Sequence, residues 1–125
     1  MIVGLGVDII KSNRVARELT RGEWHQQHGV FAAEEIGYCN AARRPELRYA
    51  GCFAAKEATV KALGTNLADL QMLREVEIRF DRGSRRAVLL RDRLQAIANE
   101  LRVKHIHLSL AMGRKNAAAM VILEF

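Results

Sequence analysis

The stretch GCFAAKEATVKALGT, residues 51–65, determines the expected fold, because it has the composition of one long helix. Proline is favoured at the first turn of a helix and glycine just after its end. We therefore expect a helix from Pro45 to Leu63, with Gly64 as its stop. Glu57 falls on the apolar stripe of this helix, where a carboxylate without a partner is costly or becomes protonated.

Glu57 and Lys61 allow two interpretations. As an i, i+4 pair on a helix surface they would stabilise the helix by about 0.2–0.5 kcal/mol. The alternative is a functional site, in which Glu57 binds a metal ion and Lys61 a phosphate. The helix has another stripe that we assign as its polar face, so we expect Glu57 and Lys61 to point away from solvent. That polar stripe consists of Arg48, Cys52, Lys56 and Thr59.

The N-terminal residues 2–10 alternate as a strand. We expect Val3, Leu5, Val7 and Ile9 to form its core face, with Gly4, Gly6 and Asp8 opposite. Glycine inside a strand often marks the close approach of a ligand or another backbone. Asp8 on this strand and Glu57 on the helix would suit Mg²⁺, which takes one or two carboxylates and draws other ligands from water and substrate phosphates.

The remaining segments predict a single α+β domain over residues 1–125, with an antiparallel sheet, one long helix across it and smaller peripheral helices. We expect helices at 12–19, 31–44 and 91–103, strands at 75–80, 87–90, 105–112 and 117–125, a loop at 65–74 and a turn at 81–86. Ser12 is the expected N-cap of the first helix.

Composition limits the function. Hydrophobic residues make up 50% of the chain, and the net charge of +6 favours a polyanionic partner, although it also serves solubility. Aromatic residues, at 6%, are too few for a nucleic-acid stacking platform.

No apolar run reaches the ~20 residues of a membrane helix, and no secretion signal is visible, so we expect a cytoplasmic protein. Cys39 and Cys52 are expected to be free, partly buried thiols.

Further residues are candidates for anion contacts. Gly64 and Thr65 follow Lys61 by one turn and would admit a phosphate, or simply end the helix. Arg43 and Arg44 would grip another phosphate or stay solvated. His107 shares a strand face with Ser109 and is a candidate for the same cleft or a structural residue. A basic stripe at helical spacing consists of Lys11, Arg14, Arg17 and Arg21.

GVDII near the N-terminus, then FAAKEATVKALGT, then HLSL before a terminal apolar strand resemble the holo-(acyl carrier protein) synthases. These are the short form of the 4′-phosphopantetheinyl transferases, and the resemblance covers nearly the whole chain. It implies transfer of the 4′-phosphopantetheine arm of coenzyme A to a serine of an apo acyl carrier protein, with release of adenosine 3′,5′-bisphosphate.

The resemblance also implies roles for residues. Mg²⁺ would bind Asp8 and Glu57, and Lys61 would contact the phosphates. The serine would be deprotonated by Glu57 or by a metal-bound water, which the sequence leaves open. Such enzymes form trimers with active sites between subunits. Arginines of the first helix contact the acidic carrier protein; Arg14 matches best and Arg21 next, with Arg17 on the same stripe.

The chain departs from the family pattern at two places. Cys52 stands where many relatives have arginine, and Ala111 and Met112 follow HLSL where relatives have Ser or Thr and then His or Asp. Both positions tend to face coenzyme A phosphates in the family. Two rival functions remain. These departures support a degenerate homologue that binds a carrier protein without catalysis, and the net charge supports a small basic nucleic-acid-binding domain.

Overall fold

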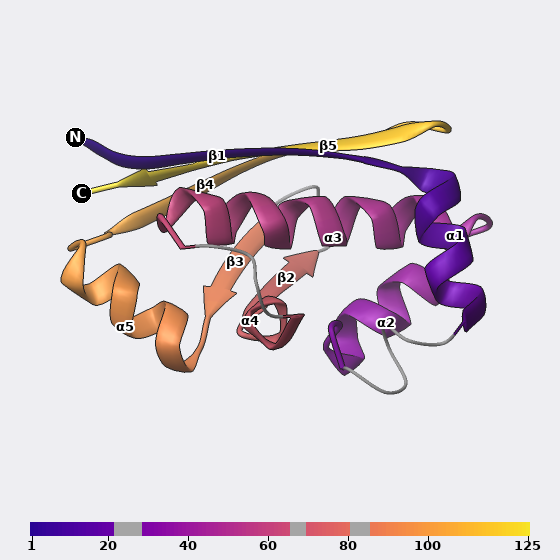
Figure 1. Cartoon of the computed structure of the whole chain (residues 1–125), viewed down its shortest axis with the longest axis horizontal. Coiled ribbons are helices and arrows are strands. Elements are labelled where there is room, and N and C mark those ends of the chain that lie inside the picture. The colour runs from indigo at the N-terminus through magenta and orange to yellow at the C-terminus, as the bar shows by residue number, and fades with distance from the viewer. Residues whose placement is uncertain (22–28, 66–69, 81–85) are drawn as a thin grey trace.

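A computed structural model describes residues 1–21, 29–65, 70–80 and 86–125, which form an α+β fold as expected (Figure 1). In place of one sheet there are two antiparallel sheets, one ordered β1-β5-β4 and one made of β2 and β3. The elements are β1 (Ile2–Lys11), α1 (Ser12–Arg21), α2 (Ala33–Asn40), α3 (Pro45–Ala62), α4 (Leu70–Arg74), β2 (Val76–Phe80), β3 (Arg86–Leu90), α5 (Asp92–Glu100), β4 (His105–Met112) and β5 (Asn116–Glu124).

Most expected elements are confirmed, and two differ. The second helix is shorter than expected, because α2 covers only Ala33–Asn40. The expected loop at 65–74 contains α4, and its residues 66–69 lie outside the described residues, as does most of the expected turn at 81–86. In the described part of the chain, every helix is too short or too polar to cross a membrane.

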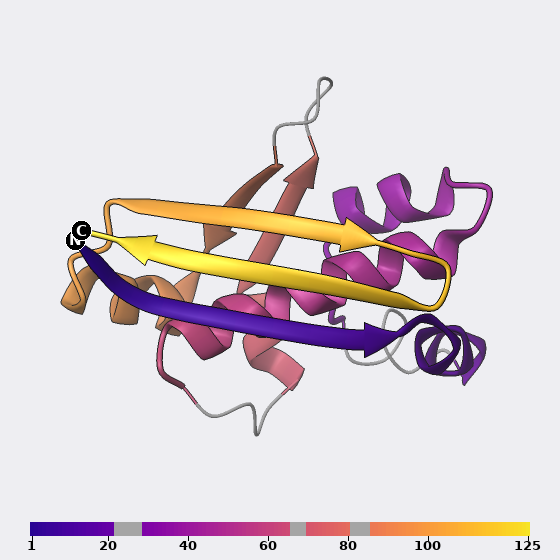
Figure 2. The ribbon, with the colours of Figure 1, turned by 90° about the horizontal axis from the view of Figure 1, so that it is seen from above.

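The three-stranded sheet brings the two ends of the chain together. β5 is the central strand and pairs with both neighbours, with Asp8 of β1 opposite Ala119. The amide of Phe125 donates to the carbonyl oxygen of Met1 over 2.8 Å. Figure 2 shows both termini at one end of the sheet, and α1 with the β4–β5 turn at the other.

Helix α3 lies between the three-stranded sheet above it and α2, α4 and the β2–β3 sheet below it (Figure 1). The prediction of a polar solvent face is therefore wrong. Cys52, Lys56 and Thr59 are completely buried, because the second layer covers the side of the helix turned away from the sheet. Gly64 ends the helix as expected, with a φ of 77°.

The face assignment for β1 is also wrong. The branched side chains of Leu5, Val7 and Ile9 are 57%, 46% and 68% exposed. The glycine face packs on α3 instead: a Cβ on Gly4 would lie 2.2 Å from the Ala62 carbonyl oxygen, and one on Gly6 would lie 1.9 Å from that of Ala58. The glycines thus mark the close approach of another backbone, which was one of the two readings of their spacing.

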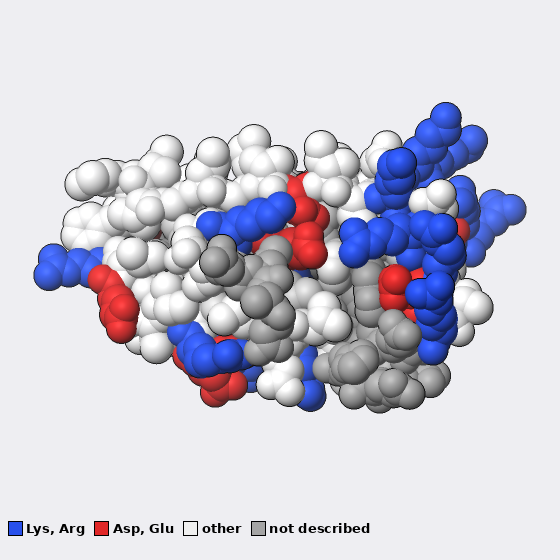
Figure 3. Space-filling model, viewed as in Figure 1, with Lys and Arg blue, Asp and Glu red and all other residues white. Residues whose placement is uncertain are grey.

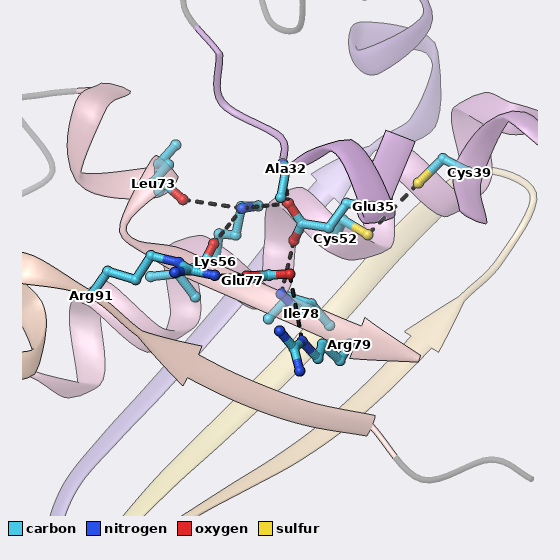
Figure 4. A network of polar contacts seen from close by, with 11 residues as sticks. Ala32, Glu35, Cys39, Cys52, Lys56, Leu73, Glu77, Ile78, Arg79 and Arg91 are labelled. Atoms are coloured by element: carbon cyan, nitrogen blue, oxygen red, sulfur yellow. Dashed lines mark hydrogen bonds and ion pairs between the residues drawn. The ribbon is translucent and has the colours of Figure 1, made fainter. Parts of the chain in front are cut away.

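A buried ion pair fixes α3 to the second layer (Figure 4). Lys56 Nζ lies 2.8 Å from Glu35 Oε1 and donates to the carbonyl oxygens of Leu73, over 3.1 Å, and Val76. Glu35 also accepts from the amides of Ala32 and Ile78, over 2.7 and 2.8 Å. Every polar atom of the pair thereby gains a partner, which a buried charge requires.

Candidate active site between β1 and α3

The carboxyl group of Asp8 is held between β1 and α3, where the glycine face of the strand meets the helix. Asp8 is only 8% exposed. Lys61 Nζ donates to its Oδ1 over 2.8 Å and to the Val7 carbonyl oxygen over 3.3 Å. The other oxygen of Asp8, Oδ2, is buried and has no hydrogen-bond partner among the described residues.

Glu57 faces Asp8 from the helix, as the spacing predicted. Its pKa is raised to about 7, mainly because burial disfavours its charge, and further because Asp8 lies close by with a like charge. The nearby cations Lys61 and Arg14 act in the opposite direction. The pKa of Lys61 is raised above its ordinary value, first by its hydrogen bond to Asp8.

These residues fit a divalent cation. A carboxyl group with a raised pKa, Glu57, and one buried carboxylate oxygen of Asp8 without a partner among the described residues are the features that a bound cation would satisfy. No group of three or more acidic, histidine or cysteine ligands occurs in the described part of the chain. Mg²⁺ suits this donor set, because it is commonly bound by one or two carboxylates and completes its shell with water and phosphate.

Basic residues flank the acidic pair. Arg14, Arg17 and Arg21 are all exposed on α1, as the predicted stripe requires. Figure 3 shows Lys and Arg side chains gathered over α1 and the adjoining end of the sheet, beside a small acidic area near the middle of α3. A negatively charged partner on α1 would therefore lie next to the acidic pair.

His107 does not join this site within one chain. Asp8 points to the α3 side of the sheet, whereas His107 and Ser109 lie on the exposed opposite face. His107 Nε2 lies 3.4 Å from Glu124 Oε1 on that face. The expectation that His107 lines the same cleft as Asp8 is thus wrong for a single subunit.

The other predicted phosphate contacts are also dispersed. Arg43 and Arg44 precede α3, and Arg44 pairs with Glu46 over 2.9 Å. Lys61 lies near the other end of this 18-residue helix, about 25 Å away at ~1.5 Å per residue. Gly64 is exposed close to Lys61, and the Thr65 hydroxyl donates to the Val60 carbonyl oxygen over 3.0 Å, as in a helix terminator.

The two departures from the family pattern lie in different surroundings, because Cys52 is completely buried whereas Ala111 is exposed and Met112 is half-buried. The Cys52 thiol is buried 3.7 Å from the Cys39 thiol, and both cysteines are free. Cys52 thus faces α2, not a nucleotide. The Met112 side chain covers Gly51, since a Cβ there would lie 2.6 Å from its Cγ and Sδ.

Sequence reasoning missed the Glu35–Lys56 pair, which anchors the helix that carries Glu57. A lysine next to a glutamate in a helix has the pattern of a solvated residue, and its partner lies on another helix. A signal was present only in the neighbouring residues, since Lys56 stands among alanines, Phe53 and Val60.

Comparisons with known proteins identify the family of this chain. A family model described as the 4′-phosphopantetheinyl transferase superfamily matches residues 4–121. The holo-[acyl-carrier-protein] synthase of Anaeromyxobacter sp. (strain K) is 40% identical over 128 residues, which cover 99% of this chain and 97% of that protein.

Two crystal structures of holo-(acyl-carrier-protein) synthases have the same fold. The Neisseria meningitidis protein gives a TM-score of 0.84 at 27% identity and covers 100% of both chains. The Bacillus anthracis protein, in complex with CoA (3′,5′-ADP), gives a TM-score of 0.75 at 27% identity and covers 98% of this chain and 96% of that one. The chain therefore belongs to the 4′-phosphopantetheinyl transferase superfamily.

Proposed function

We propose that this protein is a holo-[acyl-carrier-protein] synthase. It transfers the 4′-phosphopantetheine group of coenzyme A to a serine of an apo acyl carrier protein and releases adenosine 3′,5′-bisphosphate. The observation that carries the proposal is the meeting of Asp8, Glu57 and Lys61 between β1 and α3. The names of the full-length relatives supply the substrates.

The chemistry follows from the charges of this site. Asp8 and Glu57 would hold Mg²⁺, which supplies positive charge to the pyrophosphate when it is bound. Lys61 would move from Asp8 to a phosphate oxygen of the leaving group. The proton acceptor for the carrier serine would be Glu57 or a metal-bound water held by this site.

A homotrimer with shared sites is part of the proposal. The exposed face of the three-stranded sheet is apolar over Leu5, Val7, Ile9 and Met120, which is an unusual surface for a monomer. A shared site would also let Arg43, Arg44 and His107 of one subunit reach coenzyme A bound at the acidic pair of another. Gly64 and Thr65, which follow Lys61 by one turn, would contact a phosphate of coenzyme A, and we expect the protein to act in the cytoplasm.

The direct test mixes the protein with coenzyme A, Mg²⁺ and apo carrier protein and follows the carrier by mass spectrometry. We expect the carrier to gain the phosphopantetheine mass, and chelation of the metal to stop the gain. Glu57→Gln should reduce the rate at least a hundredfold, in line with loss of a general base and a metal ligand. Glu100→Gln, an exposed change on α5, is the matched control and should leave the rate unchanged.

The rival functions give different results. A carrier-binding homologue without catalysis would bind the carrier and leave its mass unchanged with every carrier tried. A nucleic-acid-binding domain would shift DNA or RNA in a gel with a steep dependence on salt. The acidic pair beside α1 argues against the latter, because carboxylates repel a phosphate backbone.

A further inference from the structure

The turn between β4 and β5 carries a hollow that none of the roles above uses. It has a volume of about 420 Å³ and is lined by Lys11, Asn13, Arg114, Lys115 and Asn116, which we call the hairpin hollow. Three of these five side chains are cations, two are neutral amides and none is an acid. The hollow therefore offers positive charge and hydrogen-bond donors to an anionic group.

The cations of the hairpin hollow are not used inside the protein. Lys11, Arg114 and Lys115 are exposed, and none forms an ion pair with any residue that the structure describes. Other surface arginines differ: Arg79 and Arg91 contact Glu77, and Arg93 contacts Glu75. Lys and Arg side chains gather at this end of the molecule, as Figure 3 shows.

The hollow is fixed to the start of α1. The Ser12 amide donates to the Lys115 carbonyl oxygen over 2.9 Å, and the Ser12 hydroxyl donates to that of Gly113 over 3.5 Å. Within the turn, the Gly113 amide donates to the backbone carbonyl oxygen of Asn116 over 2.9 Å. Figures 1 and 2 both place the turn beside α1. These hydrogen bonds fix the backbone of the turn relative to α1. The entropy lost when one rigid partner binds both regions is therefore smaller.

The position of the hairpin hollow beside α1 favours a protein partner over a small anion. Lys11 follows Asp8 by three residues on β1, about 10 Å along the strand at ~3.3 Å per residue, and its side chain lies on the opposite, exposed face of the strand. A protein domain that covers α1 spans this distance easily, since a typical interface buries ~800 Å² on each side. A single anion in the hollow would leave Arg14 and Arg17 of α1 without a counter-charge, whereas an acidic domain would neutralise both the hollow and these arginines.

We propose that the hairpin hollow binds acidic side chains of the apo carrier protein, so that the docking surface extends from α1 onto the β4–β5 turn. The inference rests on the proposed function, because it assigns a second contact region to the carrier of that reaction. Its specific content is that Arg114, Lys115 and Lys11 contribute to carrier affinity and not to coenzyme A affinity.

The test compares Arg114→Gln/Lys115→Gln with Arg102→Gln/Lys104→Gln, which removes two exposed charges at the far end of the molecule. Affinity for apo carrier protein is measured by fluorescence anisotropy, and KM for carrier and for coenzyme A by transfer. We expect the hairpin variant to weaken carrier binding about fivefold and to raise only the carrier KM, since exposed ion pairs contribute modestly. The control variant and the charge-preserving Arg114→Lys/Lys115→Arg should resemble wild type.

Several results would overturn the inference. Equal weakening in the control variant would mean that net charge alone matters. A rise in the coenzyme A KM with unchanged carrier affinity would assign the hollow to a nucleotide phosphate. The inference would also be wrong if the hairpin variant kept wild-type affinity for the carrier, or if the wild-type protein bound no acidic carrier. Wild type that binds carrier without transfer would contradict the proposed function only, and loss of binding in the hairpin variant would still support the inference.

Discussion

At the scale of single residues, the unusual feature is the pairing of Asp8 with Glu57. One oxygen of Asp8 is bound by Lys61, while the other is buried without a partner among the described residues. Such an arrangement is costly in a protein that binds nothing there, because desolvation of a carboxylate oxygen is not repaid. The local chemistry thus favours a cation at this point.

The carboxyl group of Glu57 offers a prediction about its own ionisation. Asp8→Asn should lower the Glu57 pKa from about 7 in the metal-free protein, because it removes the like charge of Asp8 and supplies an amide that can donate to the carboxylate. The pKa should stay above the ordinary value, since burial is its largest cause. Carbon-13 NMR of the side-chain carboxyl across pH 4–9 measures it; an unchanged midpoint would contradict the coupling.

A second residue-scale prediction concerns the buried ion pair. Lys56→Met should destabilise the protein by about 3–5 kcal/mol, because it leaves the Glu35 carboxylate buried without its counter-charge. Adding Glu35→Gln should restore part of this loss, since no charge then remains in the interior. Urea unfolding of the two single variants and the double variant measures the coupling, and simple additivity of the losses would argue against it.

At the scale of elements, the contact between β1 and α3 depends on glycine. Gly6→Ala should cost about 1–3 kcal/mol or more, because its methyl group would press on the Ala58 carbonyl oxygen of the helix backbone. Gly37→Ala on α2 is the matched control, since its Cβ meets nothing within 4 Å. Alanine there should stabilise the helix by up to ~1 kcal/mol. Thermal unfolding measures the stability of both variants. Equal changes in stability for Gly6→Ala and Gly37→Ala would contradict the packing argument.

The elements also show how far a sequence can predict this fold. The periodicity placed α3, β4 and β5 to within a few residues, and charge in apolar surroundings identified Asp8 and Glu57. The core face of β1 was assigned to Leu5 and Val7, because glycine spacing indicates a close approach but does not distinguish a ligand from a helix backbone. The five-residue helix α4 is too short to establish a period.

At the scale of the whole molecule, the exposed apolar face of the three-stranded sheet is the surface that the proposed trimer would bury between subunits. Ile9→Glu should convert the trimer to monomers and reduce transfer by more than tenfold, because a charge would be buried in the interface. Ala96→Glu, an exposed change on α5, should leave mass and rate unchanged. Light scattering during size-exclusion chromatography measures the mass; a wild-type monomer would refute the assembly.

The junction of the first and last residues has a practical consequence for engineering. Met1 and Phe125 are hydrogen-bonded neighbours at the end of the sheet opposite α1. A short linker could join them into a circularly permuted chain, opened at the exposed turn that holds Ala41. Fluorophores or affinity tags fused at either natural end would likewise stand away from α1 and leave its surface free.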